Sequence, residues 1–423
     1  MSKEIIKKPG TPWLFLVAIT AVIGFWGLIT PMFEFPDEQV HLETVSYVDA
    51  HSIIPEQKSY DVTVEMYKTQ DFLGTLRDGQ GNNKYTYHPE YRVEYVDNLF
   101  GKYENEIKLL NTEDNRNTYV KTEAARYPIA YYLYSSLWLK IVNNSDLINR
   151  SYAVRVGSIP LAFLIAYFTY EIGLIVFGKS KLALTLVFMT LLQPMFSFVT
   201  AGINSDNLHN LLFIGIIYYC LRIIKSGLSF GVVIPLLLMG ILDIYTKPQG
   251  YLAVPFIVIA LLISAARRRK WKLIGFTLLL FVGLIISTKY IWIGFINSSN
   301  SRDASFIQFL SFSANKLVAQ NIVWYWGVFK WLGVVLPAIY WRVANRVVVL
   351  SVIGIAVYWF KLIKKKKVVA DPYSIIFLIC SFVFYLVAIY WADWQHTKNM
   401  GYSLGIQARY FYPTIVAQMS LLM

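Results

Sequence analysis

Long apolar runs separated by short polar stretches make up most of the chain. Several runs reach the roughly 20 residues with which an α-helix crosses a bilayer. The runs expected to cross are 12–31, 152–177, 182–201, 207–224, 229–246, 250–266, 273–295, 344–363 and 374–391. The pattern therefore predicts an all-α fold, a polytopic integral membrane protein whose spans form a helical bundle.

Basic clusters beside the runs decide which shorter runs cross. The lysines at 7–8, RRRKWK at 267–272 and KKKK at 364–367 are expected on the cytoplasmic side, where Lys and Arg are retained. An even number of crossings must then separate each pair of clusters. On this count we expect 128–142 to be an interfacial helix on the outside, and 322–340 to be a re-entrant or interfacial segment.

The count divides the chain into stretches. They are a cytoplasmic N-terminus (1–11), a first transmembrane helix (12–31), a large extracytoplasmic loop (32–150), transmembrane helices (151–295), a second extracytoplasmic loop (296–342) and C-terminal transmembrane helices (343–423). We expect a multi-pass protein of the cytoplasmic membrane, with the lipid bilayer as its first partner.

Composition and charge narrow the function. The net charge of +13 comes from Lys and Arg placed beside apolar runs, which indicates membrane topology rather than a nucleic-acid partner. Cys220 and Cys380 both lie inside apolar runs, so neither a disulfide framework nor a thiolate metal site is indicated. No Walker-type loop or Gly-rich dinucleotide fingerprint occurs, so a lipid-carried substrate fits better than a soluble nucleotide. No cofactor is indicated, and a divalent metal stays open.

Polar residues with chemical potential collect on the predicted outer side. The candidate site residues are Asp37, Glu38, His41, Tyr127, Arg155, Asn204, Asp206, Lys247, Trp331, Arg409 and Tyr410. Their common side predicts an outward-facing site at the membrane surface rather than a pathway through the membrane.

The acidic stretch after the first run is the most informative. Pro36 suits the first turn of a helix, which places Asp37 and Glu38 near the positive end of its dipole. Helical spacing puts both acids on one face with His41. Charge this close to lipid is costly unless it is used, which favours a functional Asp37. Glu38 and His41 could support it, bind a divalent ion or be solvated.

Other acidic and basic residues allow two interpretations each. Glu34 and Glu43 are expected to cap an amphipathic surface helix. Arg409 is either an interfacial snorkelling arginine or a phosphate clamp, because a guanidinium offers fork geometry to phosphate oxygens. Lys247 is the second phosphate candidate. Asp206 either caps the helix that follows or binds substrate.

Arg155 lies about one turn inside a predicted span. It therefore needs an anionic partner, for which Asp37, Asp206 and a lipid phosphate are the candidates.

Four segments carry a family resemblance. They are FPDEQVH (35–41), QPMFSFVTAGINSDNL (193–208), YWGVFKWLGVVLP (325–337) and IQARYFYP (406–413). In this order and spacing they resemble a bacterial membrane-protein family of unknown function within the GT-C clan. The chain also resembles the GT-C membrane glycosyltransferases more broadly, in a first span followed by an Asp-Glu loop, an interfacial helix starting YPIAYYLY (127–134) and an Arg at the outer start of the next span.

The resemblance implies a GT-C-like bundle that transfers a sugar from a polyprenyl-phosphate donor to an extracytoplasmic acceptor, either a cell-envelope or lipid-linked glycan or a protein. It places the acidic pair Asp37 and Glu38 at the catalytic position, with Asp37 as base in an inverting reaction. Arg409, helped by Lys247, would hold the leaving phosphate. Trp331 would belong to a sugar platform or lipid groove.

Two functions of other classes stay open. A flippase or transporter for a lipid-linked sugar predicts charged groups deep within the spans. A non-catalytic glycolipid-binding scaffold predicts that Asp37 is dispensable.

Overall fold

The computed structural model describes residues 12–56, 60–77, 97–121, 127–269, 306–329 and 333–423. The predicted span 273–295 and the candidate Trp331 lie outside these residues.

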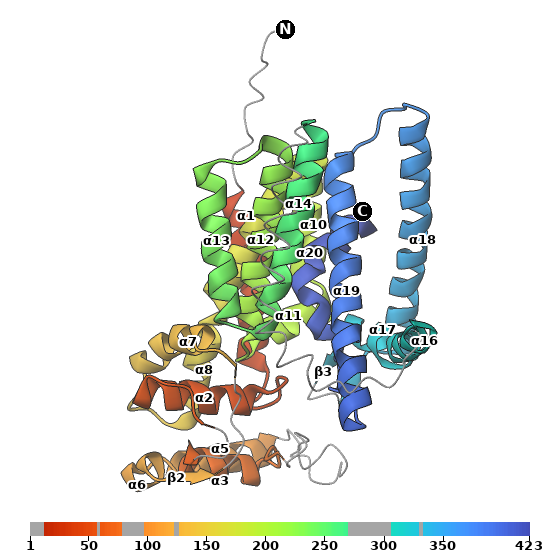
Figure 1. Cartoon of the computed structure of the whole chain (residues 1–423). Coiled ribbons are helices and arrows are strands. Elements are labelled where there is room, and N and C mark those ends of the chain that lie inside the picture. Colours follow the sequence, from red (N-terminus) through yellow and green to blue (C-terminus); the bar gives the residue numbers. More distant parts are fainter. Residues whose placement is uncertain (1–11, 57–59, 78–96, 122–126, 270–305, 330–332) are drawn as a thin grey trace.

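Five helical stretches among the described residues are long and apolar enough to cross a membrane. They are Leu147–Phe177 (α8, Leu147–Val156, and α9, Ser158–Phe177), α12 (Asp206–Ser226), Pro248–Arg267 (η2, Pro248–Leu252, and α14, Ala253–Arg267), α18 (Ala338–Ile363) and α19 (Pro372–Met400). The shorter apolar helices α1 (Trp13–Ile29) and α13 (Phe230–Ile244) run alongside them (Figure 1). The predicted class, an all-α polytopic membrane protein, is confirmed.

One predicted span is broken. Instead of a continuous helix over 182–201, α10 (Ser180–Leu191) and α11 (Pro194–Ala201) meet at 66°. Pro194 has no N–H to continue the ladder of α10, and it suits the first turn of a new helix. The Gln193 side chain accepts a hydrogen bond from the Phe196 N–H and caps that helix. Hydrophobicity alone could not show this break.

A second prediction was wrong at the end of α19, which continues to Met400 instead of ending near 391. The buried carboxylate of Asp393 accepts hydrogen bonds from Ser403 Oγ at 2.9 Å and from the Leu404 N–H at 2.7 Å. These bonds fold the following connection back along α19. The chain then enters η4 (Ala408–Thr414) and the C-terminal helix α20 (Ile415–Leu422).

A crosswise layer covers one end of the bundle (Figure 1). Helices α2 (Glu38–His51) and α7 (Ala130–Ile141) pack together there, and α7 lies within the stretch predicted as an interfacial helix. Below them, β1 (Tyr60–Thr63) pairs antiparallel with β2 (Tyr119–Lys121), next to α3 (Val64–Phe72), α5 (Asp97–Leu109) and α6 (Glu113–Asn117). The sequence did not predict this small sheet.

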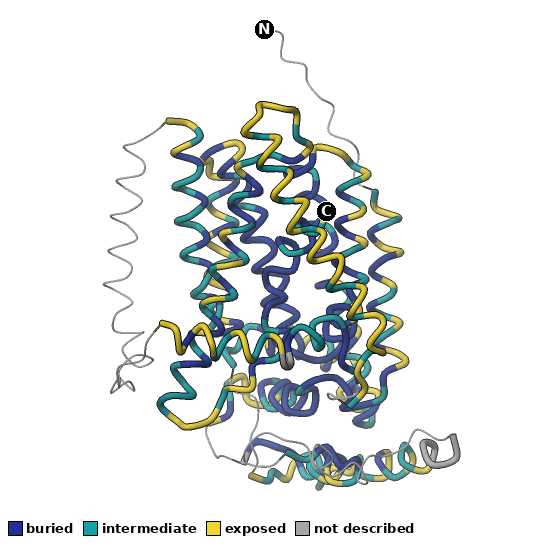
Figure 2. Tube along the Cα trace, turned by 90° about the vertical axis from the view of Figure 1, so that its right-hand side faces the viewer, coloured by how far each residue is buried: buried dark blue, intermediate teal, exposed yellow. Residues whose placement is uncertain are grey.

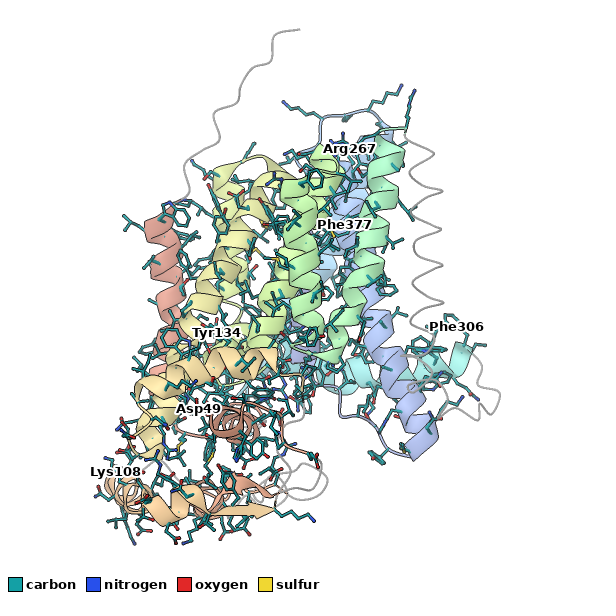
Figure 3. All side chains as sticks on the ribbon, turned by 60° about the vertical axis from the view of Figure 1, so that its left-hand side comes forward. Asp49, Lys108, Tyr134, Arg267, Phe306 and Phe377 are labelled. Carbon is teal, nitrogen blue, oxygen red and sulfur yellow. The ribbon has the colours of Figure 1, made fainter. Side chains whose placement is uncertain are left out.

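The second predicted loop contributes short elements at the same end. They are α16 (Phe306–Lys316), η3 (Leu317–Asn321), α17 (Ile322–Trp326), β3 (Val328–Phe329) and β4 (Val334–Val335). The α12–α13 and α18–α19 connections lie at the opposite end, where Figure 3 also places Arg267, whereas Asp49 and Lys108 lie at the end with α2.

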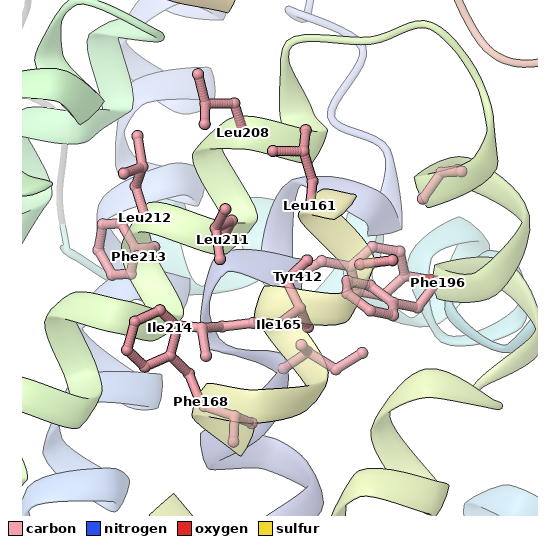
Figure 4. Close-up of a cluster of buried hydrophobic side chains, with 14 of the residues drawn as sticks. Leu161, Ile165, Phe168, Phe196, Leu208, Leu211, Leu212, Phe213, Ile214 and Tyr412 are labelled. Carbon is pink, nitrogen blue, oxygen red and sulfur yellow. The ribbon is translucent and has the colours of Figure 1, made fainter. Parts of the chain in front are cut away.

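The core runs along the middle of the bundle, where Figure 2 shows the buried positions. In Figure 4, Leu161 and Phe168 of α9, Phe213 of α12, and Phe196 of α11 with Tyr412 of η4 belong to one cluster of buried side chains. Because lipid is as apolar as these side chains, close packing rather than escape from solvent holds the helices together. The core fixes η4 against α12, which places their polar residues at one end.

Helix α18 differs from its neighbours because none of its residues is buried. Trp326 Nε1 donates a hydrogen bond to Asn345 Oδ1 at 2.9 Å, and Ser351 Oγ donates one to the Leu422 carbonyl at 3.1 Å. These polar links join α18 to α17 and α20. Most of its apolar surface faces outward, as expected for contact with lipid.

Candidate functional site

The turn between α1 and α2 presents Asp37 in an unusual backbone conformation. Phe33 and Asp37 have left-handed φ angles of 65° and 61°, which for a residue with a side chain costs about 1–2 kcal/mol. Asp37 occupies the N-cap position of α2, yet its side chain makes no capping bond. Helix α2 therefore begins at Glu38 rather than at Pro36, and strain of this kind is typical of functional sites.

Glu38 points away from Asp37 into a buried clamp with Arg155. Arg155 Nε donates to Glu38 Oε1 at 2.7 Å, and Arg155 NH2 donates to Oε2 at 2.6 Å. The guanidinium also donates to the carbonyl oxygens of Gly27 at 3.0 Å and Pro31 at 2.8 Å. The Phe33 N–H donates to Glu38 Oε2 at 2.9 Å.

This Glu38–Arg155 clamp joins α8 to the turn after α1. The guanidinium also lies 4.8 Å from the Phe35 ring centre and 5.1 Å from that of Tyr152. The partner of Arg155 is therefore Glu38, not Asp37, Asp206 or a lipid phosphate. Both side chains are buried and strongly engaged, which is the pattern of a structural ion pair.

Asp37 instead starts a chain of alternating charges, which we call the Asp37 network. Its Oδ1 accepts a hydrogen bond from Arg77 at 2.9 Å, and its Oδ2 accepts one from Arg409. Arg409 NH1 lies 3.8 Å from Asp206 Oδ2, and Asp206 Oδ1 accepts a hydrogen bond from Lys247. Three cations face two carboxylates, which leaves one net positive charge.

Asn204 holds the α11–α12 connection against the turn before α2. Its Nδ2 donates to the Pro36 carbonyl at 3.1 Å, and its Oδ1 accepts from the Asp206 N–H at 2.9 Å. Asp206 is the first residue of α12, after Ser205 in the N-cap position. The N-cap interpretation of Asp206 was therefore wrong, because its carboxylate faces Lys247 and Arg409.

Lys247 is enclosed between two aromatic rings. Its ammonium lies 5.0 Å from the Tyr127 ring centre and 5.2 Å from that of Tyr410. Burial lowers the pKa of Lys247, but the Asp206 carboxylate together with Tyr127 and Tyr410 outweighs it, so the pKa lies above its ordinary value. A Cβ at Gly250 would lie 2.6 Å from the Asp243 carbonyl carbon, so only glycine fits the turn that follows Lys247.

Arg409 keeps unused hydrogen-bonding capacity. Its side chain is 2% exposed, and its Nε has no hydrogen-bond partner among the described residues. Burial lowers the pKa of Arg409, but Asp37, Tyr410 and Asp206 together outweigh it, so the pKa lies above its ordinary value and the guanidinium is charged. A buried hydrogen-bond donor without a partner is energetically costly in a folded protein. It therefore points to a ligand that accepts hydrogen bonds.

Asp37 and Arg77 form the open edge of the network, with side chains 19% and 26% exposed. Burial raises the pKa of Asp37, but Arg409 and Arg77 together hold it well below its usual range. His41 borders this edge, with its Nδ1 3.1 Å from the Tyr132 hydroxyl and its ring stacked on Tyr127. Burial lowers the pKa of His41 to about 3, so its ring is neutral.

The interpretation of His41 and Glu38 as metal ligands gains no support. Within the part of the chain that the structure describes, no group of three or more His, Cys, Asp or Glu side chains is arranged to hold a metal ion.

Sequence reasoning also misjudged Glu43, which is buried rather than solvated at a helix cap. Its Oε1 accepts a hydrogen bond from Gln70, and burial raises its pKa to about 8. Glu43 is therefore neutral at pH 7, in contrast to the charged Asp37 at the N-cap of the same helix. Glu34 is buried as well.

Two further features were missed. Arg77 lies in the loop 51–126, which offered no pattern to interpret. A buried pair inside the bundle joins His209 Nδ1 to Asp243 Oδ1 at 2.6 Å, and His209 Nε2 lies 3.4 Å from the Tyr385 hydroxyl. Helical spacing was the available signal, because His209 is one turn after Asp206 and Asp243 one turn before Lys247.

The whole chain was also compared with known proteins. A family model described as "Predicted membrane protein (DUF2142)" matches residues 20–417. No curated protein and no solved structure matches the chain. The match spans every residue of the Asp37 network: Asp37, Arg77, Asp206, Lys247 and Arg409.

Proposed function

The chain belongs to the DUF2142 family of predicted membrane proteins, and from this premise we propose that it is a glycosyltransferase of GT-C type. In this proposal it transfers a sugar from a polyprenyl-phosphate donor to an acceptor outside the cytoplasmic membrane. The unpartnered Nε of buried Arg409, inside a network with one net positive charge, is the observation that carries it. This arrangement suits a phosphate with a single negative charge.

The position of the site supports a lipid-carried donor. The network lies where the crosswise helices α2 and α7 meet the bundle, at the end away from the α18–α19 connection and its lysines (Figure 1). In this proposal the phosphate at the end of the lipid chain reaches the network from that end of the bundle. The positive-inside rule assigns that end to the outside.

The chemistry would be an inverting displacement. The acceptor hydroxyl attacks the anomeric carbon and gives its proton to Asp37, while the bond from that carbon to the phosphate oxygen breaks. Arg409 and Lys247 stabilise the negative charge that the phosphate oxygen gains. Glu38 takes no part, because both of its oxygens are held by Arg155.

The test is an assay of the purified protein in detergent with a panel of radiolabelled polyprenyl-phosphate sugars. Wild type is compared with Asp37→Asn, Arg409→Ala and the control Asp49→Asn. Asp49 lies on α2, and its carboxylate is 3.8 Å from the Lys140 ammonium. We expect sugar release or transfer with at least one donor, lost in the first two variants and kept in the control.

One observation favours a lipid-linked sugar transporter as the second candidate. The buried His209–Asp243 pair lies within the bundle, where that function predicts charged groups. Donor binding without turnover, weakened by Arg409→Ala but unchanged by Asp37→Asn, would support the transporter or a non-catalytic scaffold instead of the enzyme.

A further inference from the structure

Both oxygens of Asp37 are engaged by guanidinium groups. Arg77 donates to Oδ1 at 2.9 Å, and Arg409 donates to Oδ2. A carboxylate held between two such groups accepts a proton poorly, because protonation would cost it both charge-assisted bonds. The arrangement therefore conflicts with the role of Asp37 as a base unless a contact opens during the reaction.

The two arginines are held differently. Arg409 is 2% exposed and also contacts Asp206 at 3.8 Å and the Pro36 carbonyl at 3.4 Å. Arg77 is 26% exposed, at the rim of the network. Among the described residues, the other charged or titratable groups near Asp37 are His41 on α2, which is neutral, Tyr127 stacked on His41, and Asp206 and Lys247 beyond Arg409.

We propose that the Arg77–Asp37–Arg409 bridge is a latch that an incoming phosphate opens. The phosphate binds the free Nε of Arg409 and competes with Asp37 for the rest of that guanidinium. Asp37 then keeps only Arg77, at the exposed edge. The proposal rests on Asp37 acting as the base, and it predicts that the donor binds before the acceptor hydroxyl is deprotonated.

The backbone of Asp37 fits this role. Its left-handed φ of 61° is not stabilised by a capping bond from its own side chain, which is turned toward the arginines instead. The network thus takes the carboxylate that a helix N-terminus would otherwise use. When Asp37 loses its contact with Arg409, its carboxylate is still placed at the exposed edge of the site.

The latch can be tested without turnover, because dicyclohexylcarbodiimide labels protonated carboxyl groups in apolar surroundings. The purified full chain is labelled in detergent over a pH series, and modification of Asp37 is quantified by mass spectrometry. We expect the labelling midpoint to rise by about 1–3 pH units in Arg77→Gln, since a close opposite charge lowers a carboxyl pKa by about that amount. Arg77→Lys should restore most of the wild-type midpoint.

Arg267→Gln is the matched control. Arg267 pairs with Asp371 at 3.2 Å with similar exposure, 28% and 23%, at the far end of the bundle. Its loss should leave the Asp37 midpoint unchanged.

A second arm adds a phosphate to wild type. A polyprenyl monophosphate without sugar should raise the midpoint, and a shift with this lipid alone assigns the site to a lipid carrier. An equal shift with inorganic phosphate supports a latch that responds to the phosphate group itself.

The latch is overturned if neither phosphate moves the wild-type midpoint, or if Arg77→Gln leaves the midpoint unchanged. Its failure is distinguishable from that of the proposed function. A shifted midpoint without sugar transfer keeps the latch and removes the glycosyltransferase. Sugar transfer with an unmoved midpoint does the reverse.

Discussion

Asp37 and Glu38 are adjacent in the chain and both contact arginines, yet their surroundings differ in one decisive way. The Glu38–Arg155 clamp is buried and closed, and its guanidinium is further engaged by carbonyl oxygens. The Asp37 network is partly exposed, and the Nε of Arg409 lacks a partner within the described structure. A saturated ion pair stabilises a fold, whereas spare donors beside an accessible carboxylate can take a ligand.

The largest effect on stability is expected in the clamp. Glu38→Gln leaves the buried Arg155 charge without its counter-charge, and breaking such a pair costs about 3–5 kcal/mol. We expect a much lower midpoint of thermal unfolding in detergent, followed by intrinsic fluorescence, and little change for Asp49→Asn. A normal midpoint with lost sugar transfer would return Glu38 to the catalytic residues.

A similar loss is expected in the network, but in activity. Arg409→Ala should lower turnover about 10²–10³-fold, as removal of a single transition-state donor does. Its unfolding midpoint should stay closer to wild type than that of Glu38→Gln, because Asp37 keeps Arg77 and Asp206 keeps Lys247. Arg409→Lys should recover activity only in part, since it lacks the guanidinium fork. Equal destabilisation by Arg409→Ala and Glu38→Gln would contradict the distinction between a structural clamp and a functional network.

Glu43 extends the comparison to a buried carboxyl group that accepts its hydrogen bond from the neutral Gln70 rather than from an arginine. Burial raises its pKa from 4.5 to about 8, so folding takes up a proton between these values. Its contribution to the free energy of unfolding is full below pH 4.5 and falls by about 1.4 kcal/mol per pH unit until the pH passes the folded-state pKa. Glu43→Gln should remove this slope and be the more stable protein above pH 8. Unfolding of both proteins across the pH range measures it, and parallel curves would contradict a buried neutral Glu43.

The smallest effect is expected at the Asp49–Lys140 pair, whose charged atoms are 3.8 Å apart, with the Lys140 side chain 61% and the Asp49 side chain 10% exposed. Pairs of this kind contribute about 0–1 kcal/mol and weaken with salt. The unfolding midpoint of Asp49→Asn should therefore match wild type at high ionic strength. A larger change would mean that charge on α2 matters beyond the clamp and the network.

The fold class followed from the sequence because membrane spans are long and apolar throughout. Local breaks were harder to predict, since Gln193 and Pro194 interrupt an apolar run without changing its hydrophobicity. Asp393 lies just after residue 391, where the predicted last span ended. The helix continues past it because the buried Asp393 carboxylate accepts hydrogen bonds from Ser403 and Leu404, which the sequence pattern does not show.

The sequence predicted most residues of the candidate site, but not which acidic residue pairs with which basic residue. Asp37 meets an arginine 372 residues away, and Glu38 meets another 117 residues away. Side-chain spacing within a helix suggested that both acids share one face, whereas the left-handed turn at Asp37 separates them. No local pattern encodes contacts at such distances along the chain. For the same reason Arg77 was not recognised.

Helix α18 links the lipid-facing surface of the protein to the helix that follows Arg409. Its 26 residues extend about 39 Å at 1.5 Å per residue, longer than a hydrocarbon core of about 30 Å. None of its residues is buried, and hydrogen bonds such as that of Ser351 tie it to the bundle, so we expect its tilt to change with membrane thickness. Ser351 links it to the end of α20, which continues directly from η4 and Arg409. In thinner membranes we therefore expect α18 to tilt further. We expect the position of the Arg409 guanidinium to change with that tilt.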